Sequence, residues 1–210
     1  PTLNVGDNQT ANTAAGICSA SVVVANAVFG DNCTVTISYT LSGATTKALT
    51  SGQVGTYTFN KGITYIDYTV TDDSNNSITD YKTITVTDTE FPLITSLPTI
   101  TRDCSVTISQ APTSPDNCGT VTGVTSDITL PYTYDIPGFY IIGWNFTDGS
   151  GNSKYISQTI IVTDIVAPVP TATSLANINY TGCEILSSQI TYPTAVDNCN
   201  GLITGVPNIQ

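Results

Sequence analysis

Residues 68–76 read YTVTDDSNN and residues 144–152 read WNFTDGSGN, so a strand of alternating residues runs into an acidic turn twice, 76 positions apart. The same offset carries ITVTD at residues 84–88 onto IIVTD at residues 160–164. A likeness that holds at fixed spacing over two strands and a turn indicates repeated modules rather than one large domain.

A second signature, Asp-Asn-Cys, occurs three times and ends at Cys33, Cys118 and Cys199. Each copy follows another cysteine by 14 to 16 residues, and these earlier cysteines are Cys18, Cys104 and Cys183. The chain is therefore interpreted as three repeats: residues 1–88, residues 89–164, and residues 165–210 as the N-terminal half of a third. Because half a sandwich would leave an apolar face and open strand edges uncovered, we expect the natural polypeptide to continue.

Alternation within the two signature segments predicts which side chains form a core. The apolar members of the alternation are Ile66, Tyr68 and Val70 in the first repeat and Ile142, Trp144 and Phe146 in the second. Successive side chains of a strand point to opposite faces, so these six are expected to be buried. The acidic stretch that follows is turn chemistry, which predicts that the next strand returns as a hairpin.

The composition favours strands throughout. The chain has eleven Tyr, five Phe and one Trp, with Val, Ile and Thr in every segment, and such side chains suit a pleated, half-buried surface. No long window shows apolar residues at helical spacing. Short strands in repeats of this length match the size of an immunoglobulin-like sandwich. The predicted fold is all-β, with tandem immunoglobulin-like β-sandwich repeats in an elongated array; a barrel or a β-solenoid is the alternative.

The six cysteines form three similarly spaced pairs, which predicts the disulfides Cys18–Cys33, Cys104–Cys118 and Cys183–Cys199 in an oxidising compartment. A metal site is the alternative, but the chain has no His and no close Cys-x-x-Cys spacing. A straight strand between the partners would separate them by about 17–20 Å, whereas bonded cysteines need Cα atoms within about 7 Å. The segment inside each pair is therefore expected to fold back or bulge.

Asp outnumbers Glu fourteen to two. Turns and oxygen-ligand metal sites are the usual reasons for short acidic side chains, so the aspartates are interpreted as residues with specific structural places. Asp88 continues the inward series of Ile84 and Val86. It is expected to meet the Asp148 turn and the Asp116-Asn117 loop, and Asp164 is expected to meet Asp197. Converging carboxylates would attract Ca²⁺, and the candidate ligands are Asp31, Asp72, Asp88, Asp116, Asn117, Asp148, Asp164 and Asp197. The alternative is that these residues only form Asx turns and end strands.

Several function classes are not expected. With five basic residues, the chain is not expected to bind nucleic acid or an anionic membrane through a positively charged surface. No apolar run is long enough for a membrane-spanning helix. Without His, a Ser-His-Asp or Cys-His arrangement is impossible, and the acids recur at strand ends rather than across a cleft. An isopeptide link would need a buried lysine, but the lysines are expected near turns or exposed: Lys47, Lys61, Lys82 and Lys154. The chain is therefore not expected to be an enzyme.

The repeated segments of this chain, taken in order, resemble the hyalin-repeat family of extracellular immunoglobulin-like modules. The matching elements are AGICSA at residues 15–20, the strand at residues 22–24, Asp-Asn-Cys at residues 31–33, and the linker from Asp88 to Pro92. The resemblance covers two full repeats and half of a third. Many members of the family carry a second Cys pair near the start and in the last strand, which this chain lacks.

The resemblance implies a place in the very long surface proteins of the Bacteroidetes, which include giant gliding-motility adhesins. We accordingly expect a structural stalk segment of an extracellular adhesin or surface filament, secreted or attached to a bacterial outer membrane. Neighbouring repeats of the same polypeptide would be its partners, and a glycan or protein ligand would bind elsewhere. The alternative is a recognition module whose exposed loops bind carbohydrate or protein directly.

Overall fold

The computed structural model describes residues 1–175, 177, 179, 181–183 and 190–206. The chain forms two compact units: unit 1 contains residues 1–95, 112–124 and 145–156, and unit 2 contains residues 96–111, 125–144 and the chain from residue 157. The predicted second repeat thus contributes segments to both units, and the boundaries at residues 88 and 164 stay a prediction. Within the described residues, no helix has the length and apolar character to cross a membrane.

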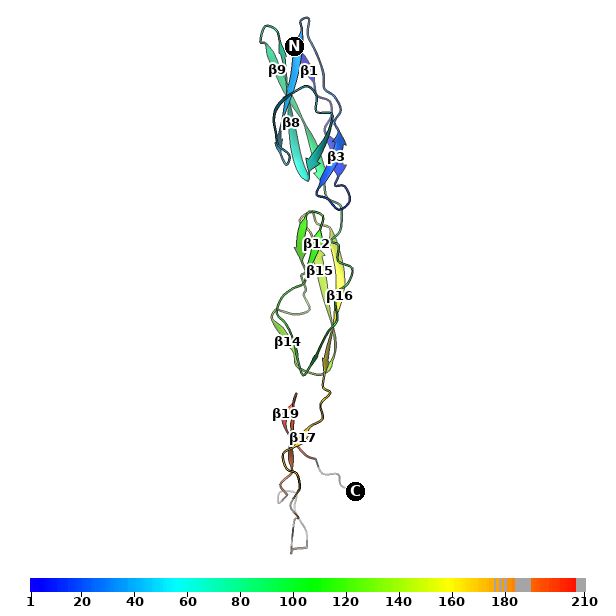
Figure 1. Ribbon diagram of the computed structural model, residues 1–210, viewed down its shortest axis with the longest axis vertical. Coiled ribbons are helices and arrows are strands. Elements are labelled where there is room, and N and C mark those ends of the chain that lie inside the picture. The colour runs from blue at the N-terminus through cyan, green and yellow to red at the C-terminus, as the bar shows by residue number, and fades with distance from the viewer. Residues whose placement is uncertain (176, 178, 180, 184–189, 207–210) are drawn as a thin grey trace. The chain divides into compact units, whose positions relative to one another are not determined.

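Unit 1 is built on a five-stranded sheet in the order β2-β9-β8-β5-β6 (Figure 1). These strands are β2 (Gln9–Asn12), β5 (Val35–Gly43), β6 (Lys47–Ser51), β8 (Gly62–Asp72) and β9 (Ser77–Thr87). Two strand pairs accompany the sheet, β1 (Thr2–Asn4) with β4 (Val28–Gly30) and β3 (Ser19–Val23) with β7 (Thr56–Asn60). The β3–β7 pair and the main sheet share one hydrophobic core. The arrangement is an immunoglobulin-like β-sandwich, as the sequence predicts.

The core of unit 1 follows the alternation read from the sequence. Ile66, Tyr68 and Val70 on β8 have no exposed surface, whereas Tyr65, which precedes them on the opposite face of the strand, is 42% exposed. The neighbouring strands supply their partners, since Val70 lies opposite Ile37 of β5 in the antiparallel register. The predicted inward face of this strand is confirmed.

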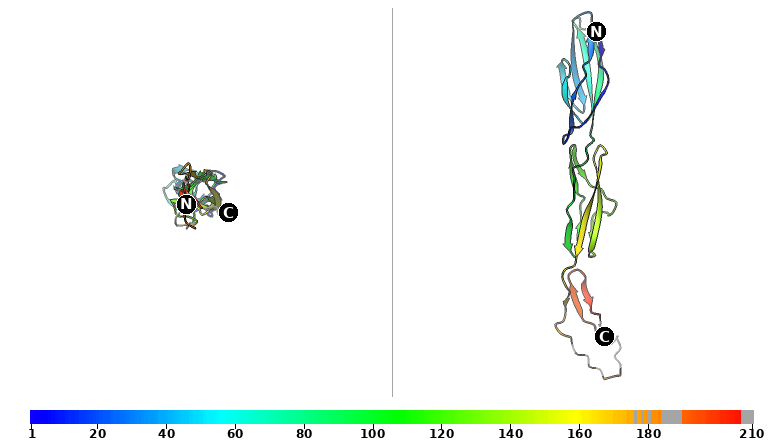
Figure 2. Two further views of the ribbon diagram at one scale, coloured as in Figure 1. Left: turned by 90° about the horizontal axis from the view of Figure 1, so that it is seen from below. Right: turned by 90° about the vertical axis from the view of Figure 1, so that its right-hand side faces the viewer.

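The sheet of the second repeat reproduces the first three strands of the order β2-β9-β8-β5-β6. Its sheet runs β10-β16-β15, with β10 (Ile100–Asp103), β15 (Gly138–Thr147) and β16 (Ser153–Thr163). The second repeat also contains two antiparallel pairs, β11 (Val106–Ile108) with β14 (Tyr132–Tyr134) in unit 2 and β12 (Thr113–Asp116) with β13 (Gly119–Thr122) in unit 1. The last sheet, in unit 2, contains β17 (Val169–Pro170), β18 (Thr194–Asp197) and β19 (Gly201–Thr204); Figure 2 shows β18 and β19 as an orange and red hairpin.

The strands β10, β15 and β16 agree in position and pairing with β2, β8 and β9. β15 and β16 start 76 positions after β8 and β9. β10 runs parallel to β16, as β2 runs parallel to β9. Trp144 is fully buried like Tyr68, and its Nε1 donates a hydrogen bond of 3.1 Å to Gln158 Oε1. The predicted core role of Trp144 is therefore confirmed, and its polar edge has a partner.

Lys82 corrects one expectation from the sequence, because it is neither near a turn nor exposed. It lies on β9 with 1% of its surface exposed, and its Nζ donates a hydrogen bond of 2.6 Å to the main-chain oxygen of Ala25. Burial lowers the pKa of Lys82, while the charge of Asp7 acts in the opposite direction. The long alkyl stem lets a lysine occupy an inward position when its charged end reaches a carbonyl.

Candidate functional site at Asp88 and the disulfide bonds

Asp88 is the most deeply buried aspartate that the structure describes. It directly follows β9, continues the inward series of Ile84 and Val86, and is 2% exposed. A carboxylate withdrawn from water this far needs hydrogen bonds or an ion partner, because its desolvation is costly. The groups around Asp88 therefore define the site.

Three donors face Asp88 Oδ1. The main-chain N–H of Glu90 donates over 3.1 Å, Asn117 Nδ2 over 3.2 Å and Thr13 Oγ1 over 3.4 Å. Thr13 precedes the first cysteine of repeat 1, and Asn117 is the middle residue of the Asp-Asn-Cys signature of repeat 2. One carboxylate oxygen thus ties two segments that are about a hundred residues apart in the sequence.

The other oxygens of Asp88 contact the acidic turn of repeat 2 and a lysine. Ser150 Oγ donates to Asp88 Oδ2 over 3.3 Å, and Asn152 Nδ2 donates to the main-chain oxygen of Asp88 over 3.2 Å. Lys61 Nζ lies 3.6 Å from Oδ2 and compensates part of the buried charge. These contacts all belong to unit 1. The predicted convergence of the Asp116-Asn117 loop and the acidic turn on Asp88 is therefore found.

The Asp116-Asn117 loop leaves two oxygens without a protein partner. Asp116 Oδ2 accepts the main-chain N–H of Cys118 at 3.0 Å. Asp116 Oδ1 and Asn117 Oδ1 are buried, and no hydrogen-bond partner is found for either among the described residues. Ligand atoms of Asp88, Asp116 and Cys118 lie within 4.8 Å of one another. Two carboxylates and a free amide oxygen are the donor types that Ca²⁺ uses, whereas the bonded sulfur of Cys118 is not.

Asp148 and Asp72 are engaged differently, because each closes its own turn. Asp148 Oδ1 accepts the main-chain N–H groups of Ser150 and Asn152, both at 2.8 Å, and Oδ2 accepts Asn152 Nδ2 at 2.7 Å. Asp72 makes the same three contacts at 2.8 Å with Ser74 and Asn76. Both residues therefore follow the Asx-turn alternative.

The Asp148 turn is expected to weaken in acid. Burial alone would raise the pKa of Asp148, but hydrogen bonds from Asn152, Ser150 and Gly151 outweigh it and hold the pKa below the ordinary 3.8. A carboxylate with a lowered pKa in the folded state contributes stability that is complete above its unfolded value and is lost as the pH falls through the folded value. Melting temperature measured against pH should therefore drop in this range, and Asp148→Asn should flatten the drop.

Asp135→Asn is the control for that measurement, since Asp135 is exposed in the loop before β15. Its pH profile should follow that of the unmodified chain. An Asp148→Asn profile as steep as the unmodified one would contradict the role given to the turn.

The disulfides differ from the predicted pairing. Cys18 is bonded to Cys118, with an S–S distance of 2.04 Å and a Cα–Cα distance of 4.7 Å. Cys104 is bonded to Cys199, with 2.10 Å between the sulfurs and again 4.7 Å between the Cα atoms. Each bond joins the first cysteine of one repeat to the Asp-Asn-Cys cysteine of the next. The predicted pairs Cys18–Cys33, Cys104–Cys118 and Cys183–Cys199 are therefore wrong.

The physical reason can be seen at the first predicted pair, Cys18 and Cys33. β3 follows Cys18 directly and is five residues long, so it carries the chain about 17 Å away from that cysteine. Cys33, beyond β4, is left as an exposed free thiol, and Cys183 is exposed and free as well. Cys18 and Cys118 lie instead beside the residues that contact Asp88. Asn117, which precedes Cys118, donates from Nδ2 to the main-chain oxygen of Ile17, which precedes Cys18, at 3.4 Å.

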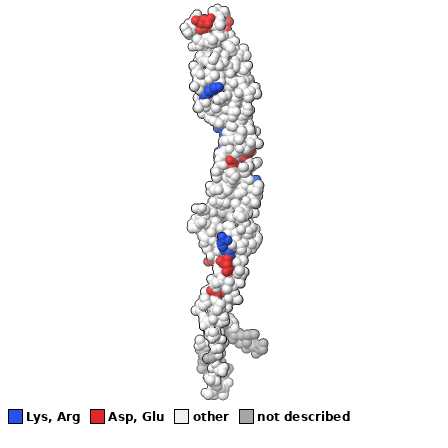
Figure 3. Space-filling view, in the orientation of Figure 1, with Lys and Arg blue, Asp and Glu red and all other residues white. Residues whose placement is uncertain are grey.

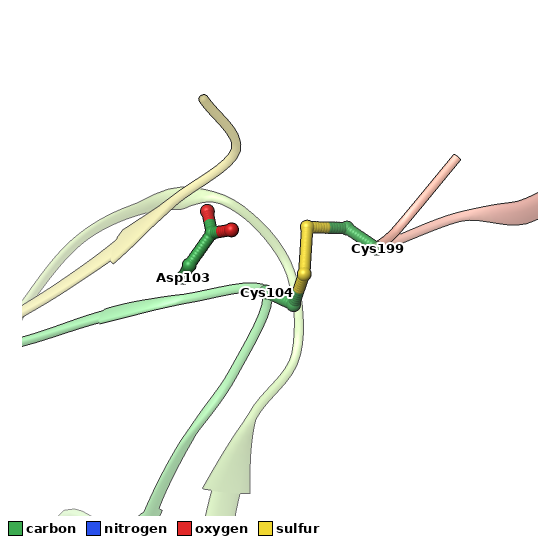
Figure 4. A group of neighbouring side chains, drawn as sticks. All are labelled: Asp103, Cys104 and Cys199. Carbon is green, nitrogen blue, oxygen red and sulfur yellow. A yellow bond between two sulfur atoms is a disulfide. The ribbon is translucent and has the colours of Figure 1, made fainter. Parts of the chain in front are cut away.

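In unit 2 the Cys104–Cys199 bond is also accompanied by a polar contact from the signature Asn, with different hydrogen-bond partners. Asn198, the counterpart of Asn117, donates from Nδ2 to Asp103 Oδ2 at 2.8 Å and lies 3.1 Å from Cys104 Sγ. Figure 4 shows the carboxylate of Asp103 beside the Cys104–Cys199 bond. A polar contact from the middle residue of the signature thus accompanies both disulfides.

The predicted partners Asp164 and Asp197 come together in unit 2. Their ligand atoms lie within 4.8 Å of each other and of Cys199 Sγ. Asn200 bridges them, since its Nδ2 lies 3.4 Å from Asp164 Oδ2 and 3.3 Å from Asp197 Oδ1. Main-chain hydrogen bonds from Asn200 and Cys199 hold the pKa of Asp197 below its ordinary value. Asp164 is exposed, in contrast to Asp88.

Asp31, the counterpart of Asp116 in repeat 1, binds the chain terminus. Its Oδ2 lies 2.7 Å from the amino group of Pro1. That contact, followed by a hydrogen bond from the Asn32 N–H, lowers the pKa of Asp31. The structure therefore places Asp31 beside an ammonium group, while the nearby charge of Asp72 acts on the pKa of Asp31 in the opposite direction.

Sequence reasoning missed four residues that contact Asp88: Thr13, Lys61, Ser150 and Asn152. Asn152 carried a usable signal, because it ends the repeated turn at the same position as Asn76. Thr13 and Lys61 carried none, since their approach to Asp88 depends on how loops at the end of the sandwich pack.

No protein-family model matches the chain, and no curated protein matches it. Membership of the hyalin-repeat family therefore stays a prediction. Among solved structures, the chain is similar to fibronectin(III)-like modules of Clostridium thermocellum CbhA, with 14% identity over 77% of this chain and 94% of that one and a TM-score of 0.30.

Two further solved structures are similar at the same low level. A protocadherin gammaB7 cis-dimer shares 14% identity over 95% of this chain and 60% of that one, with a TM-score of 0.34. A Bacteroides ovatus protein of a mixed-linkage glucan utilization locus, in complex with a heptasaccharide, shares 11% identity over 97% and 64%, with a TM-score of 0.24. At these scores the likenesses carry no argument about function.

Proposed function

We propose that this chain is a stalk segment of a long extracellular adhesin or surface filament, with its repeats in tandem and a binding region held elsewhere. Disulfides are typical of oxidising, extracellular compartments, which supports the location. The observation that carries the proposal is the pairing itself: Cys18–Cys118 and Cys104–Cys199 each bond one repeat to the next. A recognition module has no need of such bonds, whereas a stalk under tension does.

The two bonds change the route by which force passes along the chain. From Cys18 the shortest covalent route crosses to Cys118, returns along the backbone to Cys104 and crosses to Cys199. The strands of the main sheets, β5, β8, β9, β15 and β16, lie off this route. Tension is therefore carried by two disulfides and one short segment instead of by hydrogen bonds between strands. Extension of single oxidised chains under force tests the proposal, because a stalk must keep its length.

The surface supports a structural role over a catalytic one. Charged residues make up 10% of the chain, and Figure 3 shows them thinly scattered over the visible face. We propose that the chain is not an enzyme, since it contains no His and its aspartates either close turns or meet at the ends of strands.

We also propose that Ca²⁺ binds at Asp88, Asp116 and Asn117 and stiffens the connection between repeats. The unpartnered oxygens of Asp116 and Asn117 support it. The ion would have to replace the Lys61 ammonium beside Asp88 Oδ2, because two cations within a few ångströms repel each other. Water would supply the remaining ligands of the six to eight that Ca²⁺ takes.

Chelation is expected to loosen the angle between repeats within the range that the Cys18–Cys118 bond between them permits. Small-angle scattering with and without chelator measures this change, and elemental analysis measures bound calcium. Asp88→Asn should lose the ion, whereas Asp135→Asn should retain it. An unchanged scattering profile together with no calcium would mean that these aspartates only form turns and bind Lys61.

Direct recognition is the second candidate function, and one surface feature favours it. Tyr134 packs against Tyr132 and Tyr140, with ring centroids 4.8 and 4.5 Å apart, and Tyr132 is 42% exposed. Grouped aromatic faces are common in sugar-binding surfaces because ring and apolar sugar faces stack. A glycan array separates the two functions: hits that disappear in Tyr132→Ala favour recognition, and a stalk gives none.

A further inference from the structure

Two of the six cysteines are free where their counterparts in the neighbouring repeats are bonded. Cys33 corresponds to Cys118 and Cys199, the final residues of the Asp-Asn-Cys signature, and both of those form disulfides. Cys183 corresponds to Cys18 and Cys104, and both of those are bonded too. Cys33 and Cys183 are exposed free thiols. Each therefore lacks the bonding partner that its counterparts have in the Cys18–Cys118 and Cys104–Cys199 disulfides.

We propose that Cys33 and Cys183 are complementary bonding sites, each of which forms a disulfide with a further repeat of this type. Cys33 accepts a cysteine of the Cys18 and Cys104 kind, and Cys183 accepts a cysteine that follows Asp-Asn. The inference rests on the observed bonds and goes beyond the stalk proposal, because it holds wherever the chain operates. The result is a continuous ladder of disulfides.

The local structure at Cys33 shares a preceding short strand and an Asn before the cysteine with the bonded copies, and differs in how that strand is paired. In the bonded copies the signature follows a short paired strand, β12 before Cys118 and β18 before Cys199. Cys33 follows β4, which pairs with β1 and not with the strand after the signature, whereas β12 pairs with β13 and β18 with β19 across the signature. Asn117 and Asn198 in the bonded copies donate to atoms beside the partner cysteine. Asn32, in the same position before Cys33, is exposed and available to make this contact.

The partner side requires an acceptor directly before the cysteine. Ile17 supplies its main-chain oxygen before Cys18, and Asp103 supplies its carboxylate before Cys104. Gly182 precedes Cys183 and carries a main-chain oxygen, so Cys183 can receive an incoming Asp-Asn-Cys segment in the way that Cys18 does.

The bond-forming step is a two-electron oxidation. The two Sγ–H groups lose two protons and two electrons as the S–S bond forms, and a disulfide oxidant is reduced to two thiols. A thiol–disulfide oxidoreductase or a small-molecule disulfide serves as that oxidant. The incoming repeat belongs either to the same polypeptide or to a second copy of this chain, in which Cys183 of one copy meets Cys33 of the other.

Peptide mapping of the protein from its natural source, with thiols alkylated before isolation and no reductant added, tests the inference. Cys33 should be recovered bonded to a cysteine at the position of Cys18, and Cys183 bonded to one that follows Asp-Asn. Mass before and after reduction distinguishes a bond within one polypeptide from a bond between copies. Recovery of both residues in alkylated form would overturn the proposal.

A mixing experiment with the 210-residue chain tests whether the two sites are complementary. The variant Cys33→Ser keeps Cys183, and Cys183→Ser keeps Cys33. Oxidised together with a glutathione redox buffer, the two should give the Cys33–Cys183 heterodimer in at least about ten-fold excess over either homodimer, because only that pair reproduces the observed contacts. Homodimers as abundant as the heterodimer would show unselective thiols and contradict complementarity.

Discussion

Pulled from its ends in the oxidised state, the chain should lengthen between Cys18 and Cys199 by no more than the covalent route allows. That route contains only the backbone from Cys104 to Cys118, about 50 Å at ~3.5 Å per residue. With both disulfides reduced, the whole segment unravels to roughly 630 Å. Single-molecule force spectroscopy with and without reductant measures this difference of more than ten-fold.

Two variants give graded controls for the force experiment. In Cys18→Ser/Cys118→Ser the route runs along the backbone to Cys104 and then crosses to Cys199, for about 300 Å. In Cys104→Ser/Cys199→Ser it crosses first and then follows the backbone to residue 199, for about 280 Å. Oxidised chains that extend as far as reduced ones would contradict the proposed force route and with it the stalk function.

Removal of one disulfide is expected to destabilise the repeats strongly. Cys104 and Cys199 are 95 positions apart, and closing a loop of about 100 residues stabilises the folded state by about 4.7 kcal/mol according to chain entropy. Cys104→Ser/Cys199→Ser should lose a comparable amount of its unfolding free energy. The single Trp, Trp144, is buried inside this loop. Its fluorescence during denaturant unfolding therefore measures the loss.

Cys33→Ser/Cys183→Ser is the matched control, because both residues are exposed free thiols in the monomer. Its unfolding midpoint should equal that of the unmodified chain. The two disulfide loops share the segment from Cys104 to Cys118, so the remaining bond already restricts the unfolded chain and the two losses should not add. A midpoint unchanged by loss of Cys104–Cys199 would contradict the expected entropic effect.

The strands were predictable because strand geometry is local. Alternation in β8 and β15 identified buried Tyr68 and Trp144, since a period of two follows directly from the pleat. The same series carried on to Asp88 and placed it at the end of the core. Lys82 escaped this reasoning although it lies on β9 in the same alternation, because residue type suggested exposure and only the carbonyl of Ala25 makes burial possible.

The disulfide pairing was not predictable from spacing alone. Three similarly spaced pairs arise whether each cysteine bonds within its repeat or bonds one repeat further along. The distance spanned by an extended strand already disfavoured Cys18–Cys33, and β3 shows that this geometric argument should have outweighed the regular spacing. Which distant loop meets Cys18 is a property of how repeats pack, and the sequence of one repeat does not contain it.

The aspartates fall into two groups for a similar reason: some have partners close in the sequence, and Asp88 has partners far away in it. Asp148 and Asp72 find their partners within four residues, so turn chemistry described them fully. Asp88 draws its partners from four separate segments, and only the Asp116-Asn117 loop and the acidic turn were recognisable as repeated motifs.

The overlap of the two disulfide loops also governs what a protease can do to this chain. A cut anywhere from residue 18 to residue 199 falls inside at least one loop, so the two pieces remain covalently joined. A cut between Cys104 and Cys118 falls inside both loops and leaves two bonds across the break. A protein exposed to secreted proteases would thus survive any single nick between Cys18 and Cys199 in one piece, and only reduction would separate the fragments.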